Sequence, residues 1–218
     1  MIRYVAWDWN GTLLDDVDGC VHVLNRMLGH RGLGSMTREA YRERFGFPVR
    51  PFYETLGFDC SPGAYAALSE EFIAAYRGLR AEVSLHEGAL DVLGRLGRCV
   101  QGQLVVSAME HNLLGLMLAD YGVLPHLQDH RGTQNLQAGS KVEIGVAALS
   151  ALSAAAAEIV FVGDTEHDHE VAEAVGCQCV LLSQGHQNER RLRRTGRPVL
   201  STLTSVVSWV EAQSAARW

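Results

Sequence analysis

Short apolar runs alternate with helical patterns along most of this 218-residue chain, and no other feature limits its fold as strongly. The runs are rich in β-branched residues, and several end at a polar residue or a glycine, as buried parallel strands do. An alternation of strands and helices predicts an α/β fold, in which helices cover both faces of a parallel sheet. The predicted strands are Arg3–Trp7, Gln103–Ser107, Glu158–Val162, Gln178–Leu182 and Pro198–Leu200.

One long stretch breaks this alternation. From Asp16 to Leu85 the chain shows helical periodicity and no convincing strand. A block of about seventy residues is too long for an ordinary crossover between two strands. We therefore predict an α/β core formed by residues 1–15 and 86–218, with an α-helical cap subdomain of residues 16–85 inserted after the first strand.

Charge and composition narrow the class of protein. The chain has 19 Lys and Arg against 25 Asp and Glu, a net charge of -6, which argues against nucleic acid or an anionic membrane as partner. No apolar run reaches the roughly 18 residues of a membrane span, and the first residues do not resemble a signal peptide. Its five cysteines form no C-x-x-C pair, which favours reduced thiols. We predict a cytoplasmic protein.

Polar residues follow or flank the predicted strands. Asp8 follows the first strand, Ser107 ends the second, and Asp164 and Asp168 follow the third. Lys141 begins the helical pattern that precedes the third strand. Ligands of open α/β sheets bind at the carboxyl ends of the strands, so we expect these side chains to share one rim. Carboxylates in oxygen-rich surroundings suit Mg²⁺, while a lysine and a hydroxyl suit a phosphate.

Each of these residues also fits an ordinary structural role. Ser107 and Glu110 have the spacing of a helix capping box, and Asp168 fits the cap of the helix that follows it. Asp15 and Asp16 likewise fit the cap of a helix that begins near Val17. Taken together, in this order and at strand ends, the polar residues favour a functional site.

Four segments carry a resemblance to a known family: DWNGTLLDD, LVVSA, GSKVEIG and VGDTEHD. They match, in order, D-x-D-G-T/V, a Ser or Thr at a strand end, a lysine, and G-D-x-x-x-D. In these motifs the chain resembles the haloacid dehalogenase-like (HAD) superfamily of hydrolases, in its phosphoglycolate-phosphatase-like branch. The resemblance implies a Rossmann-like core of three layers with a parallel sheet and a helical C1-type cap inserted after the first motif.

The resemblance also implies roles for the motif residues. Asp8 would attack phosphorus and form an aspartyl-phosphate, Lys141 would pair with Asp8 and the phosphate, and Ser107 would donate to a phosphoryl oxygen. A Mg²⁺ cofactor would be held by Asp8, the backbone carbonyl of Asn10 and Asp164. Asp168 would complete this metal site by holding a metal-bound water or Lys141. The phosphate-binding residues that it implies are Gly11, Thr12, Ser107, Ala108 and Lys141.

Asn10 departs from the family pattern. Phosphatases of the family have an aspartate there, which protonates the leaving group and then activates water. An amide cannot exchange a proton at neutral pH, and general acid–base catalysis is typically worth ~10²–10⁴-fold in rate. Asn10 therefore predicts a slow phosphatase, although it remains a candidate catalytic residue by position. Histidines that could take over the acid–base role are His111, His167, His169 and His186.

Substrate selection would fall to the cap. The segment Phe47–Tyr53 is our candidate for the part that reaches the site, with Arg50 holding an anionic group of the substrate. The alternative is that Phe47, Phe52 and Tyr53 pack the cap interior and Arg50 lies at the surface.

These observations predict a Mg²⁺-dependent phosphatase that acts on a small phosphorylated metabolite, as a monomer or homodimer. The alternative is a non-catalytic phosphate-ester binder or regulatory pseudo-phosphatase. Cleavage of a carbon–halogen bond is disfavoured, because the chain keeps Asp164 and Asp168 as a metal-like pair. A two-component receiver domain is disfavoured by the inserted cap and by the position of Asp8 on the first strand.

Overall fold

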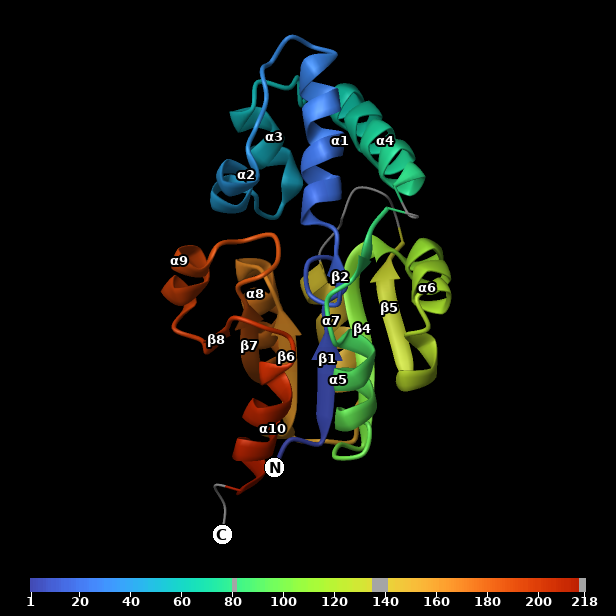
Figure 1. Ribbon diagram of the computed structural model, residues 1–218, viewed down its shortest axis with the longest axis vertical. Coiled ribbons are helices and arrows are strands. Elements are labelled where there is room, and N and C mark those ends of the chain that lie inside the picture. The colour runs from blue at the N-terminus through green and yellow to red at the C-terminus, as the bar shows by residue number, and fades with distance from the viewer. Residues whose placement is uncertain (80–81, 135–140, 216–218) are drawn as a thin grey trace.

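The computed structural model describes residues 1–79, 82–134 and 141–215; within these it shows a six-stranded sheet with helices on both faces (Figure 1). The strands pair in parallel in the order β5-β4-β1-β6-β7-β8. Strands β4 and β5 lie on one side of β1, and β6, β7 and β8 lie on its other side, so the strand order reverses at β1. Ligands of α/β sheets bind at such switch points. The six strands are β1 (Tyr4–Trp7), β4 (Gly102–Glu110), β5 (Asp129–Thr133), β6 (Ile159–Gly163), β7 (Gln178–Leu182) and β8 (Val199–Leu200).

Side chains alternate between the two faces of the sheet. Val5 and Trp7 of β1 enter one hydrophobic cluster, and Ala6 enters the other, as the two-residue period of a strand requires. The first cluster lies under α5 (Ala89–Leu96), α6 (His111–Asp120) and α10 (Ser205–Ala215). The second lies under α7 (Lys141–Ser150), α8 (Glu166–Val175) and the short α9 (Glu189–Leu192). The remaining helical turns are 3₁₀ segments at Leu124–His126, Ala156–Glu158 and Arg193–Thr195.

In the described chain, four helices lie between the short strands β2 (Leu14–Asp15) and β3 (Ser84–Leu85), above the carboxyl end of β1 (Figure 1). We call them the cap helices. The chain enters through β2 and leaves through β3, and these short strands pair antiparallel. The first hydrophobic cluster continues from the sheet into this region, so the predicted division into two subdomains stays a prediction. The cap helices are α1 (Val17–Gly29), α2 (Arg38–Arg44), α3 (Val49–Thr55) and α4 (Pro62–Gly78).

Polar contacts hold the cap helices against the loop that follows β7. The Arg42 guanidinium on α2 donates through Nε to the carbonyl of Gly185 at 2.7 Å. In return, Gln187 Nε2 donates to the carbonyl of Phe45 at 3.0 Å, and the amide of Asn188 donates to the Arg42 carbonyl at 3.2 Å. The cap helices are thus closed over the rim of the sheet.

The five predicted strands are confirmed, with small changes at their ends. Strand β5 was not predicted, because its sequence, DHRGT, is polar and lies at the edge of the sheet. The capping box at Ser107 is wrong: β4 extends through Ser107 to Glu110. The Glu110 carboxylate instead caps α6, accepting from the amides of Asn112 and Leu113 at 2.9 and 3.0 Å.

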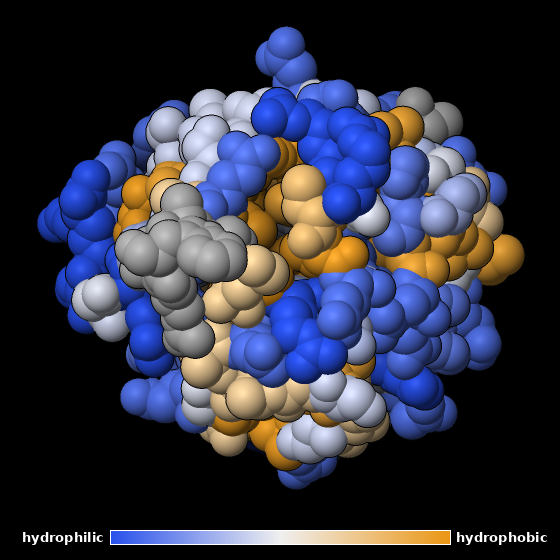
Figure 2. Space-filling view, turned by 90° about the horizontal axis from the view of Figure 1, so that it is seen from below, coloured by the Kyte–Doolittle hydropathy of each residue, from blue (hydrophilic) through white to orange (hydrophobic). Residues whose placement is uncertain are grey.

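The five cysteines all lie in the described part of the chain and are free thiols. Among the described helices, none is long and apolar enough to cross a membrane. The end of the molecule opposite the cap helices shows hydrophilic residues with hydrophobic areas between them (Figure 2).

Candidate active site

Three predicted site residues meet at the carboxyl ends of three neighbouring strands. Asp8 follows β1, Ser107 lies in β4, and Asp164 follows β6. The backbone amide of Asp8 donates to the carbonyl of Val162 on β6 at 2.8 Å, so the strand register itself fixes the position of Asp8. All three side chains are buried beneath the cap helices. The sheet therefore brings together what the order of motifs predicted.

Lys141, at the first position of α7, lies between two carboxylates. Its Nζ atom is 2.5 Å from Asp8 Oδ1 and 2.5 Å from Asp168 Oδ1, and all three side chains are almost inaccessible to solvent. Burial opposes the charge on Lys141, but Asp168 and Asp8 outweigh it and raise its pKa, so the ammonium form persists. The segment leading into Lys141, residues 135–140, lies outside the described residues.

Asp168 holds Lys141 and the loop after β6. Its Oδ2 accepts from the amides of Asp164 and Thr165 at 3.0 and 2.9 Å and from the Thr165 hydroxyl at 2.8 Å. This is the predicted helix cap of α8, and it occurs together with the contact to Lys141. Asp168 therefore positions Lys141 and caps α8 at the same time.

The acidic cluster fits a divalent cation. Carboxylate oxygens of Asp8, Asp164 and Asp168 all lie within 4.8 Å of one another. Burial raises the pKa of Asp8 and of Asp164, since one ammonium group does not balance three buried carboxylates. Three carboxylates and one lysine leave two negative charges, and an all-oxygen donor set suits Mg²⁺. The donor chemistry and the charge thus agree with the predicted cofactor.

The turn after Asp8 has no room for larger residues. Gly11 adopts a positive φ of 75°, and a Cβ atom there would lie 2.4 Å from Asp164 Oδ2 and 2.5 Å from the His186 ring. The Thr12 hydroxyl donates to Asp164 Oδ1 at 2.8 Å, and the His186 amide donates to Asp164 Oδ2 at 2.6 Å. Gly11 and Thr12 therefore position Asp164, a role that differs from the predicted phosphate contact.

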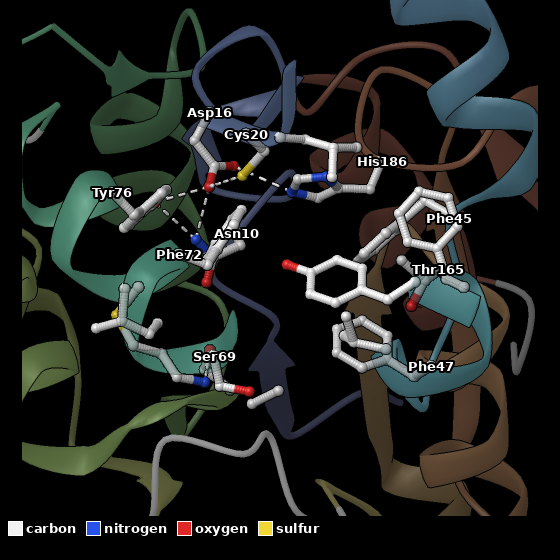
Figure 3. Close-up of a pocket in the computed structure, with 18 of the residues that line it drawn as sticks. Asn10, Asp16, Cys20, Phe45, Phe47, Ser69, Phe72, Tyr76, Thr165 and His186 are labelled. Carbon is white, nitrogen blue, oxygen red and sulfur yellow. Dashed lines mark hydrogen bonds and ion pairs between the residues drawn. The ribbon is translucent and has the colours of Figure 1, made fainter. Parts of the chain in front are cut away.

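The side chain of Asn10 is oriented by two acceptors. Its Nδ2 donates to Asp16 Oδ2 at 2.7 Å and to the Tyr76 hydroxyl at 2.9 Å. Since only the amide nitrogen can donate, the Oδ1 atom is turned away from Asp16, as Figure 3 shows. Asn10 lines the cavity beside Asp8 and offers an acceptor oxygen there.

Asp16 and His186 form a buried ion pair that the sequence analysis missed. Asp16 Oδ1 lies 3.2 Å from His186 Nε2, and the Tyr76 hydroxyl donates to Asp16 Oδ2 at 2.7 Å (Figure 3). Burial would favour the neutral imidazole, but Asp16 raises the pKa of His186 to about 9. Burial likewise opposes the charge of Asp16, yet His186 and the hydrogen bonds lower its pKa. The pair is therefore charged at neutral pH.

The predicted capping role of Asp16 is wrong, although the residue does precede α1. Its side chain makes no capping hydrogen bond to the helix. It accepts instead from the Gly11 amide at 2.9 Å, turning back toward the loop after β1. The neighbouring Asp15 faces solvent. The sequence Asp15-Asp16 alone therefore does not show which of the two aspartates is buried and which is exposed.

A cavity of about 160 Å³ lies between the cap helices and the rim of the sheet. Its floor includes Asp8, Lys141, Ser107 and Ala108. Ser107 Oγ accepts from the Met109 amide at 3.1 Å, which holds the Ser107–Met109 turn against the cavity. Figure 3 shows aromatic rings and Asn10 around this space. The aromatic residues that line it are Tyr41, Phe45, Phe47, Phe52, Tyr53, Tyr65, Phe72 and Tyr76.

The structure places Arg50 outside the cavity. Arg50 is exposed on α3, where its Nε lies 3.3 Å from Glu54 Oε1 and its guanidinium lies 5.9 Å from the Tyr65 ring centroid. Phe47, Phe52 and Tyr53 line the cavity, so this segment reaches the site with aromatic side chains. Arg50 is not among the described residues that line the cavity, and its guanidinium contacts Glu54 instead, so its predicted contact with an anionic substrate stays a prediction.

Three of the four candidate histidines lie away from the cavity walls. His111 stacks on His130 with ring centroids 4.9 Å apart, and His167 Nδ1 is 2.6 Å from Glu170 Oε2. His169 Nδ1 accepts from Arg197 Nε at 3.1 Å. Only His186 of the four lines the cavity.

The fold and site define an α/β protein with a buried carboxylate–lysine centre beneath helices inserted after the first strand. The family model described as haloacid dehalogenase-like hydrolase matches residues 5–182. That match covers most of the chain, which therefore belongs to the haloacid dehalogenase-like hydrolase family.

The chain is also similar to named relatives and to solved structures. The chain is 28% identical, over 85% of each chain, to a protein of Xanthomonas campestris named phosphoglycolate phosphatase. It is 25% identical, over 96% of its own length and 72% of the other, to a Mycobacterium tuberculosis protein named tyrosine-protein kinase PtkA. A haloacid dehalogenase-like hydrolase structure from Streptococcus pneumoniae superimposes with a TM-score of 0.82 at 17% identity, covering 96% of this chain and 98% of that one.

Proposed function

We propose that this protein is a Mg²⁺-dependent phosphatase that hydrolyses a small phosphomonoester through an aspartyl-phosphate on Asp8. The observation that carries the proposal is the contact of Lys141 with both Asp8 and Asp168 at the floor of the cavity. The relative named phosphoglycolate phosphatase supports the same reaction class. We further propose that it acts in the cytoplasm, as a monomer or homodimer, on a metabolite rather than on nucleic acid or a membrane.

Asp8 would act as the nucleophile. Lys141 occupies Oδ1, and no hydrogen bond from the described residues reaches Oδ2, which is therefore the atom available for attack. The new bond joins Oδ2 to phosphorus while the ester P–O bond breaks and the alcohol leaves. Water then attacks phosphorus, releases inorganic phosphate and restores the carboxylate. Such covalent catalysis divides one difficult displacement into two easier ones.

Lys141 and Ser107 would bind the phosphoryl group. The Lys141 ammonium is held in place by Asp168, so it can stay beside Asp8 while charge develops on the phosphoryl oxygens. The Ser107 hydroxyl lies at the floor of the cavity and can donate to one of these oxygens. Asp8, Asp164 and the backbone carbonyl of Asn10 would hold Mg²⁺, which when bound supplies further positive charge at the phosphoryl oxygens.

Asn10 would slow both steps. Its Oδ1 atom can accept a hydrogen bond from water, but it cannot take the proton, and its Nδ2 is occupied by Asp16 and Tyr76. The leaving alkoxide would then draw its proton from solvent. Loss of general acid–base catalysis lowers the rate by ~10²–10⁴-fold while the nucleophile and the electrostatic contacts remain.

The same feature favours a second candidate, a phosphate-ester binder without turnover. A rapid acid quench, followed by measurement of the phosphate bound covalently to the protein, separates the two candidates. A phosphatase should accumulate phosphate on Asp8 in the first turnover, and the Asp8→Asn variant should not. A binder should show neither, while still binding the ester.

The first experiment is phosphate release from a panel of phosphomonoesters, with magnesium chloride and with chelator. We expect slow, Mg²⁺-dependent release that Asp8→Asn abolishes. Activity that persists in Asp8→Asn, or that ignores chelation, would contradict the proposal.

The second experiment tests the role of Asn10. The single variant Asn10→Asp places a carboxylate where an amide donates to Asp16 at 2.7 Å, so two like charges would meet. The double variant Asn10→Asp/Asp16→Asn exchanges the amide and the carboxylate between the two positions, so one negative charge remains and it lies at position 10. We expect the double variant to release phosphate faster than the wild type by at least about tenfold. Unchanged turnover in both variants would show that position 10 does not limit the rate.

A further inference from the structure

The wall of the cavity on the side of the cap helices is apolar. Aromatic rings of α3 and α4 and the turn before α3 line it, together with aliphatic side chains such as Leu24 and Ile73. In Figure 3, Phe45 and Phe47 lie on one side of the cavity and Phe72 and Tyr76 on the other. Whatever part of a substrate lies above Asp8 is therefore enclosed by carbon atoms on several sides.

The charged groups that line the cavity are already paired. Among the described lining residues these are Asp8, Lys141, Asp16 and His186. Lys141 is bound by Asp8 and Asp168, and His186 is bound by Asp16. A substrate carboxylate above Asp8 would thus find no unpaired cation on this wall, and burying an unpaired charge is costly.

Arginines near the cavity do not supply that cation. Arg50 projects outward to Glu54. Arg42 donates to the carbonyls of Gly185 and Ser183, so its guanidinium is part of the contact between α2 and the sheet. Neither arginine is among the residues that line the cavity.

Several polar atoms of the wall are also used within the protein. The Tyr41 hydroxyl lies 2.9 Å from His186 Nδ1, the Tyr76 hydroxyl donates to Asp16, and Ser69 Oγ donates to the Tyr65 carbonyl at 2.9 Å. A sugar or other polyol would lose hydration there without gaining these groups as free partners.

The size of the space limits the ligand further. The cavity has a volume of about 160 Å³. An apolar protein cavity of about 150 Å³ takes up a molecule of benzene. The phosphoryl group would lie on the floor at Asp8, so the space above it has room for a group about the size of one ring.

We propose that the substrate of this site is a phosphomonoester of an uncharged, apolar alcohol about the size of a single ring. This inference rests on the proposed function. It sets the chain apart from an enzyme for an ester with a carboxylate, such as phosphoglycolate, because the described residues on the cap side of the cavity are largely apolar and include no free cation.

The test compares esters that differ in charge but have alcohols of similar leaving ability: benzyl phosphate and 4-carboxybenzyl phosphate, with phosphoglycolate as a third. With magnesium chloride present, we expect kcat/KM for benzyl phosphate to exceed that for each of the two esters with a carboxylate by at least about tenfold. Equal values, or a preference for an ester with a carboxylate, would overturn the inference while leaving the phosphatase activity intact.

A matched pair of variants on α4 tests the wall itself. Ile73 lines the cavity and is half-buried, whereas the neighbouring Ala74 is exposed and does not line it. Ile73→Lys places an ammonium group in the wall, and we expect it to shift the ratio of kcat/KM values toward 4-carboxybenzyl phosphate by at least about tenfold. Ala74→Lys should leave the ratio unchanged. Equal shifts in both variants would contradict a role for the wall.

Binding separates failure of this inference from failure of the proposed function. Titration calorimetry with benzylphosphonate and 4-carboxybenzylphosphonate needs no turnover. If no ester is hydrolysed but benzylphosphonate binds at least about tenfold more tightly, the phosphatase proposal fails and the preference for an apolar group stands. If neither phosphonate binds, or the carboxylate analogue binds better, the preference is wrong.

Discussion

The buried pair of Asp16 and His186 makes a sharp prediction about stability. Asp16→Asn keeps the shape of the side chain but removes its charge, and it leaves the protonated His186 without a counter-ion in a site closed to solvent. Removing one partner of a buried ion pair leaves an uncompensated charge, which typically costs ~3–5 kcal/mol. We therefore expect Asp16→Asn to lower the free energy of unfolding strongly at neutral pH.

The pKa of His186 gives the magnitude and the pH dependence. Its folded-state pKa is about 9 against an ordinary value of 6.5, and this rise corresponds to roughly 3–4 kcal/mol. A raised pKa means that this stabilisation is present in full below pH 6.5 and is lost as the pH rises through 9. The difference between wild type and Asp16→Asn should thus be largest near pH 6 and shrink by about 3 kcal/mol toward pH 10.

Urea unfolding, followed by circular dichroism at several pH values from 6 to 10, measures this difference. Asp15→Asn is the matched control, because Asp15 is adjacent and exposed, and it should change the free energy of unfolding by no more than about 0.5 kcal/mol. A loss in Asp16→Asn that stays the same at every pH would refute the charged pair. So would a loss at pH 6 no larger than that of the control.

Three further predictions concern the acidic cluster. Lys141→Met should lower the free energy of unfolding by ~3–5 kcal/mol at pH 7, since it leaves buried carboxylates unpaired. Chemical unfolding should show a smaller loss as the pH is lowered, because burial raises the pKa of Asp8 and its carboxyl group can take up a proton. Mg²⁺ should raise the Tm of the wild type in thermal unfolding and should do so much less in Asp164→Asn. Gly11→Ala should abolish that Mg²⁺ response, because its Cβ would strike Asp164, whereas Gly122→Ala, at a similar φ with open space, should keep it.

The fold was largely predictable because it depends on patterns that the chain repeats. Buried strands such as β6 and β7 are continuous apolar runs, and a parallel sheet that is covered on both faces requires such runs. Strand β5 escaped this reasoning because an edge strand pairs on one side only, so polar residues are tolerated there. The pairing of β2 with β3 escaped as well, since two residues per strand give no detectable period.

The site was predictable only where the backbone of the sheet places it. Asp8, Ser107 and Asp164 meet because neighbouring parallel strands end at the same rim. Asp16 and His186 are 170 positions apart, and nothing local to either residue indicates that they meet. Arg50 shows the converse: it lies in the segment that does reach the cavity, yet the face of a short helix on which it lies decides whether it points in or out.

Asn10 and Asp16 are best understood as one arrangement. An aspartate at position 10 would bring its carboxylate against Asp16, beside the same His186 cation. An amide avoids that repulsion and donates to Asp16 instead, so Asn10 stabilises the ion pair. Tyr76 on α4 joins the same group of hydrogen bonds, which links the orientation of Asn10 to the closed position of the cap helices. It follows that position 10 cannot be changed alone without disturbing the cap. Only the paired exchange, Asn10→Asp with Asp16→Asn, measures its chemical role.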